Sequence, residues 1–249
     1  MILLLPVRGI PEVEPGLPLG RCIVDGLAAG GQAIERGDIL VVAQKIVSKT
    51  EGRIVKLENV TPSQFALRIA REMNGRDARV LEVVLGETRR IVRMDRGVLI
   101  AETAHGFVCA NAGVDLSNVD GGASASLLPL DPDASAARIA GEIESITGAA
   151  VGVIVSDTFG RPWREGLVDV AIGIHGFAAT SDCRGQIDPH GYPLQATILA
   201  DADQLAAAAG LVFRKTERVP VCLIRGFRLT PGQGTARDLV RPPEKDLFR

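Results

Sequence analysis

The sequence predicts an α+β fold with mixed and antiparallel sheets and packed helices. Apolar runs rich in β-branched residues alternate with amphipathic stretches of helical period. The turn Asp95-Arg96-Gly97 between two such runs is a hairpin signal, so some neighbouring strands pair antiparallel. Hairpins mixed with helices favour α+β over a simple βαβ winding. Hydrophobic residues make up 46% of the chain and aromatic residues only 4%, which indicates a large aliphatic core.

The elements follow from local patterns along the 249 residues. Apolar and β-branched runs predict strands at 2–7, 38–49, 89–94, 98–103, 151–155, 168–179 and 219–227. Amphipathic stretches predict helices at 21–37, 61–75, 131–148 and 201–215. We expect Gly37 to end the first helix, Thr61 to cap the second, and the strand at 38–49 to become polar at its end.

The chain is expected to form one unit over residues 1–249, with a poorly marked boundary between two subdomains near 125–150. The formal net charge is −2, so no basic excess exists to bind a nucleic-acid backbone. The first apolar run ends at Pro6, and no window approaches the ~20 apolar residues of a membrane span. We therefore expect a cytoplasmic protein without a membrane or nucleic-acid partner.

Common nucleotide-binding motifs are absent from the sequence. It contains no G-x-x-x-x-G-K-[ST] phosphate loop (P-loop) and no G-x-G-x-x-G between a strand and a helix. G-x-S-x-G is missing as well. If the protein binds a nucleotide, it uses a less common binding motif.

One candidate site is the stretch 109–124, CANAGVDLSNVDGGAS. Its small residues let backbone N–H groups approach a ligand closely. Asp115 offers the oxygen ligand that a hard divalent cation prefers. An ordinary loop rich in turn residues has the same composition, so this reading stays open.

The second candidate is the stretch 153–166, VIVSDTFGRPWREG. We expect Asp157 at the end of a buried strand, where α/β-type folds place ligand-binding acids, with Thr158 adding an oxygen ligand. Arg161 and Arg164 suit phosphate or carboxylate groups. A structural cluster of ion pairs at a helix end is the alternative.

The third candidate is VSKTEGRIV, residues 47–55, where Lys49 and Arg53 flank Glu51. A functional site and a solvated turn fit this pattern equally well. Together, the three stretches indicate an enzyme that binds anions and metal, with phosphate chemistry as the leading interpretation. The residues by themselves do not name a substrate.

Several stretches together resemble the coenzyme F-420-0:γ-glutamyl ligase family. They run through nearly the whole chain, in order: LPVRGIPEV, KIVSKTEGR, GFVCANAGVDLSN, VSDTFGRPWREG, DVAIG and LVRPPEKDLF. The resemblance implies a GTP-dependent, GDP-forming acid–amino-acid ligase that uses Mn²⁺ or Mg²⁺. It joins L-glutamate through a γ-linked amide to the lactyl-phosphate arm of coenzyme F-420-0. It also implies an α+β fold without a P-loop and an intertwined homodimer.

The resemblance also implies roles for individual residues. The metal ligands would be Asp115, Asp157 and Thr158. The GTP site would contain Ile10, Pro11, Glu12, Val13, Gln44, Lys49, Asn118 and Lys215. Two departures from the family pattern are Gln44, where a small hydroxyl residue is common, and Arg214, where Gly usually precedes the lysine.

The chemistry to be expected is activation of a carboxylate by GTP, because oxide is a very poor leaving group. Transfer of the γ-phosphate would give an acyl phosphate, which the glutamate amine then attacks. Lys49, Arg161 and Arg164 would stabilise the charge that develops on transfer. A metal-dependent phosphohydrolase and an inactive module that binds nucleotide or deazaflavin remain as alternatives.

Overall fold

A computed structural model describes residues 1–117, 119–213 and 217–246. Its main sheet has five strands in the order β1 (Leu3–Val7), β12 (Val221–Arg225), β2 (Ile39–Ala43), β8 (Gly152–Arg161), β9 (Arg164–His175). Strands β2 and β8 pair parallel and the other neighbours antiparallel. The predicted α+β class with mixed and antiparallel sheets is confirmed.

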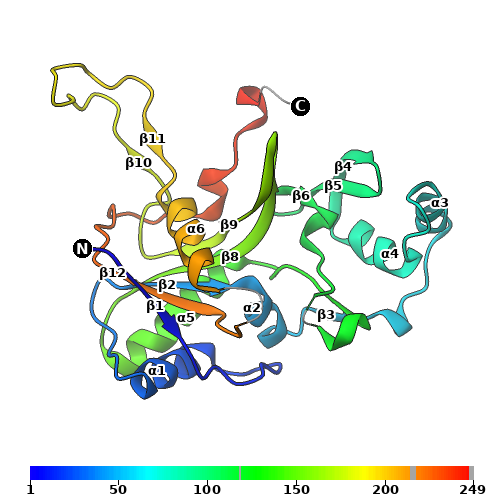
Figure 1. Cartoon of the computed structure of the whole chain (residues 1–249), viewed down its shortest axis with the longest axis horizontal. Helices are drawn as coiled ribbons and strands as arrows, with labels where there is room; N and C mark the ends of the chain where they lie inside the picture. The colour runs from blue at the N-terminus through cyan, green and yellow to red at the C-terminus, as the bar shows by residue number, and fades with distance from the viewer. Residues whose placement is uncertain (118, 214–216, 247–249) are drawn as a thin grey trace.

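Helices cover both sides of this sheet (Figure 1). Helix α6 (Asp201–Phe213) lies on one side, and α1 (Leu19–Ala29) and α5 (Pro132–Thr147) pack together on the other. The core between them is aliphatic, as the composition predicts, because strands buried on both faces read as continuous apolar runs.

Residues 57–127 enclose a second, smaller core. It contains α3 (Gln64–Glu72), α4 (Ala78–Gly86) and the antiparallel sheet β4 (Thr88–Asp95), β5 (Val98–Thr103), β6 (Val108–Ala110). Strands β3 (Ile54–Lys56) and β7 (Ser124–Ser126) pair at the junction with the main body. Figure 1 shows this part beside the main sheet, beyond the β8–β9 hairpin. The subdomain boundary near 125–150 stays a prediction.

A long arm leaves the main body between β9 and α6 (Figure 1). Its base is the short antiparallel pair β10 (Ser181–Asp182) and β11 (Ile198–Leu199). Within the described residues, no helix is long and apolar enough to cross a membrane.

Several local predictions are confirmed, including the hairpin around Asp95-Arg96-Gly97 and the helix predicted at 131–148, which the structure has at Pro132–Thr147. Two are wrong at a boundary. The first helix ends at Ala29, because Gly30 and Gly31 stop it and Gly31 has a φ of +71°. The cap of the second helix is Ser63, which accepts a hydrogen bond from the Ala66 backbone amide, and not Thr61.

The predicted strand at 38–49 is also wrong in its second half. The strand ends at Ala43, and helix α2 (Gln44–Thr50) follows directly. The β-branched pair Ile46 and Val47 suggested a strand, but tertiary packing overrides this weak propensity. This helix decides which side chains reach the candidate site.

Candidate functional site

Asp157 lies within a strand and not at its end, which corrects the sequence-based expectation. Strand β8 continues to Arg161 and pairs with β9 along its whole length. Residues 152–156 of β8 are buried, whereas Asp157 is only partly buried. The acid therefore sits where the strand leaves the core.

Lys45 on α2 contacts the other predicted metal acid. Its ammonium group donates to Asp115 Oδ2 at 2.8 Å and to the Ser117 carbonyl oxygen at 2.6 Å. Ser117 also donates to Asp115, through its backbone amide at 2.8 Å and its hydroxyl at 2.7 Å. Burial alone would raise the pKa of Asp115, but the hydrogen bonds from Lys45 and Ser117 outweigh it, and the pKa lies below its ordinary value.

The pKa of Asp157 is shifted in the opposite direction to that of Asp115. Burial raises the pKa of its carboxyl group to about 7, because the charged form loses its hydration. The Thr158 backbone amide lowers this pKa, Asp115 raises it and Lys45 lowers it. Asp115 and Asp157 are thus close enough to interact, and Lys45 supplies the nearby positive charge.

This donor set fits a hard divalent cation. Two carboxylates that repel each other gain most from a cation between them, and oxygen ligands suit Mg²⁺ and Mn²⁺. The Lys45 ammonium already occupies such a position at Asp115. Across the described ranges, no group of three or more His, Cys, Asp or Glu side chains could hold a metal by itself. Substrate phosphates would have to complete the coordination.

The Thr158 side chain points to the other face of β8, since neighbours in a strand alternate. Its hydroxyl donates to Asp169 Oδ1 at 2.6 Å, and these two residues are paired across β8 and β9. Asp169 packs against Gly210 of α6, where an added Cβ would lie 2.2 Å from Asp169 Oδ2. The structure therefore does not place the Thr158 hydroxyl in one ligand set with Asp115 and Asp157.

Lys49 on α2 contacts the loop after β1, and the role of both in binding GTP stays a prediction. Lys49 forms an ion pair with Glu12, which lowers the pKa of that carboxyl group, and the Gly16 backbone amide donates to the Thr50 carbonyl oxygen at 2.8 Å. In the predicted range Ile10 to Val13, Val13 is buried and Glu12 is exposed.

Gln44 occupies the start of α2 and is buried. The Ser48 hydroxyl lies 2.8 Å from its side-chain oxygen and donates to the Leu127 carbonyl oxygen at 2.6 Å. This predicted nucleotide contact thus packs at the junction with β7. Of the remaining predicted nucleotide contacts, Asn118 and Lys215 lie outside the described residues, as does Arg214.

Arg161 and Arg164 lie at the tip of the β8–β9 hairpin. Arg161 donates to the Glu165 carbonyl oxygen at 2.5 Å, which closes the turn, and Arg164 is exposed. Arg161 lies four positions further along the strand than Asp157, or ~13 Å away. The structure does not bring either arginine beside the acid pair, and their catalytic role stays a prediction.

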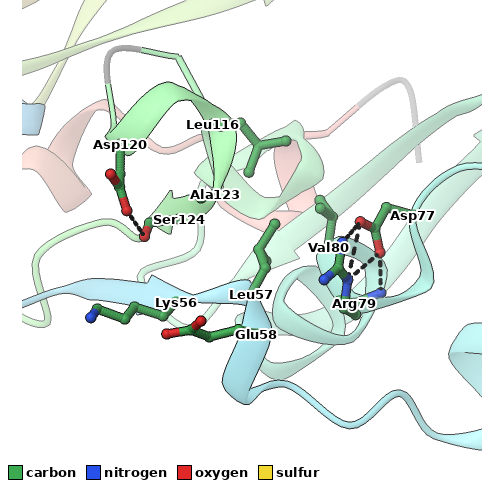
Figure 2. A pocket seen from close by; sticks show the side chains of 11 residues that line it. Lys56, Leu57, Glu58, Asp77, Arg79, Val80, Leu116, Asp120, Ala123 and Ser124 are labelled. Carbon is green, nitrogen blue, oxygen red and sulfur yellow. Dashed lines mark hydrogen bonds and ion pairs between the residues drawn. The ribbon is translucent and has the colours of Figure 1, made fainter.

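A cavity of 320 Å³ opens beside the loop that follows Asp115 (Figure 2). Leu116 and Asp120 line one side, and Asp77 and Arg79 line the other. Asp77 and Arg79 bind each other, and Ser124 donates to Asp120 at 3.3 Å. Its lining contains none of the predicted site residues that the structure describes.

Sequence reasoning missed Lys45 and Asp169. Lys45 and Lys49 are four residues apart, so on a helix they share one face. A strand prediction for this stretch conceals that relation. Asp169 would have been recognised only from the register that pairs it with Thr158.

The fold and this cluster define a class of protein: an α+β protein that brings two acidic side chains and a lysine together where a buried strand leaves the core. A family model described as F420-0:Gamma-glutamyl ligase matches residues 9–226. The chain therefore belongs to this family and is a ligase.

Three similar proteins support the assignment. The chain is 45% identical to the coenzyme F420:L-glutamate ligase of Methanothermobacter thermautotrophicus, over 100% of this chain and 99% of that protein. It is 45% identical to the protein of the same name in Methanocaldococcus jannaschii, over 87% and 86% of the two chains. For Methanopyrus kandleri the identity is 42%, over 97% and 99%.

Proposed function

We propose that this protein joins L-glutamate to the lactyl-phosphate arm of coenzyme F-420-0 through a γ-linked amide, using GTP and Mn²⁺ or Mg²⁺. The relatives named for ligation of glutamate to this coenzyme support the substrates. The observation that carries the chemistry is the cluster of Asp115, Lys45 and Asp157, which presents two acids and an ammonium group at one place. GTP and the metal rest on the family resemblance and on this donor set.

The reaction proceeds in two displacements. A carboxylate oxygen of the acceptor attacks the γ-phosphorus of GTP, the bond from that phosphorus to the β-phosphate oxygen breaks, and GDP leaves. The glutamate amine then attacks the acyl carbon, the carbon–oxygen bond to phosphate breaks, and phosphate leaves. The nitrogen loses protons to solvent or a nearby base, and the amide remains.

The side chains of this chain bind and orient the anions. Asp115 and Asp157 would hold the divalent cation, which supplies charge neutralisation on the phosphate oxygens. Lys45 and Lys49 project from one face of α2 and would bind phosphate oxygens as charge develops on them. A nearly neutral chain needs such a local concentration of cations.

The direct test is the mass of the product. Protein incubated with coenzyme F-420-0, L-glutamate, GTP and Mn²⁺ should yield the acceptor with one or more glutamate residues added. An acceptor of unchanged mass, with GTP consumed, would instead favour the metal-dependent phosphohydrolase. Binding of GTP and acceptor with neither change would favour the inactive module.

We further propose that the protein is an intertwined homodimer and that the arm contributes to it. The arm carries four exposed apolar side chains: Ile187, Tyr192, Ile198 and Leu199. Exposed apolar surface of this kind marks protein interfaces. Sedimentation velocity at micromolar concentration should give a dimer, and a monomer there would contradict the proposal.

A further inference from the structure

A second cavity, of 230 Å³, is lined by residues of β8 and β9 that neighbour Asp157 in the sheet. Val170 and Phe159 form part of its wall. Val170 is the cross-strand partner of Asp157, and directly opposite residues of an antiparallel pair share a face with Cβ atoms ~5 Å apart. Phe159 is two residues along β8 with no register shift between, so it shares that face too.

Three other elements complete this cavity. Phe107, just before β6, contacts Phe159 edge to face, with ring centroids 6.4 Å apart. Val240 and Arg241 of the C-terminal segment form the outer wall, where Arg241 is exposed. The wall is therefore largely apolar and aromatic, with one cation at the rim.

One polar group in the cavity wall, the Asp203 carboxylate, has an oxygen that can accept a further hydrogen bond. Asp203 of α6 accepts a hydrogen bond from the Ala171 backbone amide at 2.9 Å through Oδ1. Within the described residues, no hydrogen bond to Asp203 Oδ2 is found. Burial raises the pKa of Asp203, which a donor from a ligand would counteract.

These features select the kind of ligand. Apolar and aromatic walls suit a flat ring system, and the Asp203 oxygen suits an N–H or O–H group at its edge. Arg241 suits an anionic substituent. Complete small-molecule sites usually measure ~300–1,000 Å³, so this cavity fits one part of an elongated ligand.

We propose that this cavity holds the flat ring system of the acceptor substrate, with its anionic arm running past Val170 toward Asp157. The proposal rests on the proposed ligase function, because the deazaflavin ring of coenzyme F-420-0 is planar and carries such donors. Seated this way, the ring anchors the acceptor while its terminal carboxylate reaches the GTP phosphates.

The test uses two variants, each of which fills the cavity with a tryptophan side chain. Val240→Trp and Val108→Trp each place a large side chain at a residue that lines the cavity. Calorimetric titration with coenzyme F-420-0, without glutamate, should show Kd raised at least tenfold in both variants, or ~1.4 kcal/mol. The Kd for GTP should stay within twofold. Val98→Trp, the same substitution at an exposed position of β5, is the matched control and should bind the acceptor as the wild type does.

Thermal melting of each variant identifies a folding defect. Only a cavity variant that melts at the wild-type temperature is used to judge the proposal. Unchanged acceptor affinity in a correctly folded cavity variant overturns the proposal. Wild-type protein that binds the acceptor but never extends it with glutamate refutes the ligase function and leaves the cavity result standing. Wild-type protein that extends it, with cavity variants that bind it normally, refutes the cavity assignment alone.

Discussion

Replacing Asp157 by asparagine lowers turnover at least ~100-fold, the scale of losing a main electrostatic contributor to catalysis. Asparagine keeps the shape of the side chain but removes the charge that a hard cation requires beside Asp115. Steady-state GDP release with saturating acceptor, glutamate and Mn²⁺ measures the effect. Asp25→Asn, at an exposed position of α1, is the matched control and should turn over normally.

The same substitution separates function from stability. Burial raises the folded-state pKa of Asp157 to about 7 from an ordinary 3.8, so the charged form opposes folding. The free energy of unfolding therefore falls as pH rises above the ordinary pKa of 3.8, and the loss is complete above pH 7. In metal-free buffer at pH 8, the free energy of unfolding of Asp157→Asn should therefore equal or exceed that of the wild type. Near-normal turnover would remove Asp157 from the site.

Replacing Lys45 by methionine should lower turnover by ~10- to 100-fold, since one cation facing the phosphates is lost. It also leaves the Asp115 carboxylate without its ion pair, although Asp115 is 42% exposed. We expect a loss of no more than ~1 kcal/mol in metal-free buffer. Added Mn²⁺ should stabilise this variant more than the wild type, because the metal then replaces the missing ammonium group.

Thermal melting with and without Mn²⁺ measures that difference, alongside GDP release. Lys245→Met replaces an exposed lysine near the C-terminus and serves as the control. Equal stabilisation of wild type and Lys45→Met by Mn²⁺ would contradict the idea that Lys45 and the metal share the Asp115 carboxylate. Normal turnover of Lys45→Met would remove Lys45 from the phosphate site.

Some parts of this fold are predictable from local patterns and others are not. The hairpin around Asp95-Arg96-Gly97 and the helix at Pro132–Thr147 follow from turn and capping chemistry, which acts over a few residues. The helix at Gln44–Thr50 does not, since Ile46 and Val47 favour a strand locally and only packing in the core selects the helix.

The candidate site shows the same division. The acids Asp115 and Asp157 can be recognised as candidates from their neighbours in sequence, and the family resemblance names them as metal ligands. Lys45 can be recognised as a candidate site residue only once residues 44–50 are known to be helical, because the helix places it on the same face as Lys49. The cavity beside Asp157 depends on the register between β8 and β9, because Val170 faces Asp157 only in that pairing. Register is a long-range property, and one sequence does not reveal it.

GDP release measured with each reactant omitted in turn tests the central claim most directly. We expect sustained release over many turnovers from GTP and Mn²⁺ to require both coenzyme F-420-0 and L-glutamate, with one glutamate added to the acceptor for each GDP formed. Without acceptor, GTP has no carboxylate to phosphorylate. Without glutamate, no amine consumes the acyl phosphate, so turnover stops. GDP release that continues at an equal rate without glutamate, with no gain in acceptor mass, would contradict the assignment and identify a hydrolase.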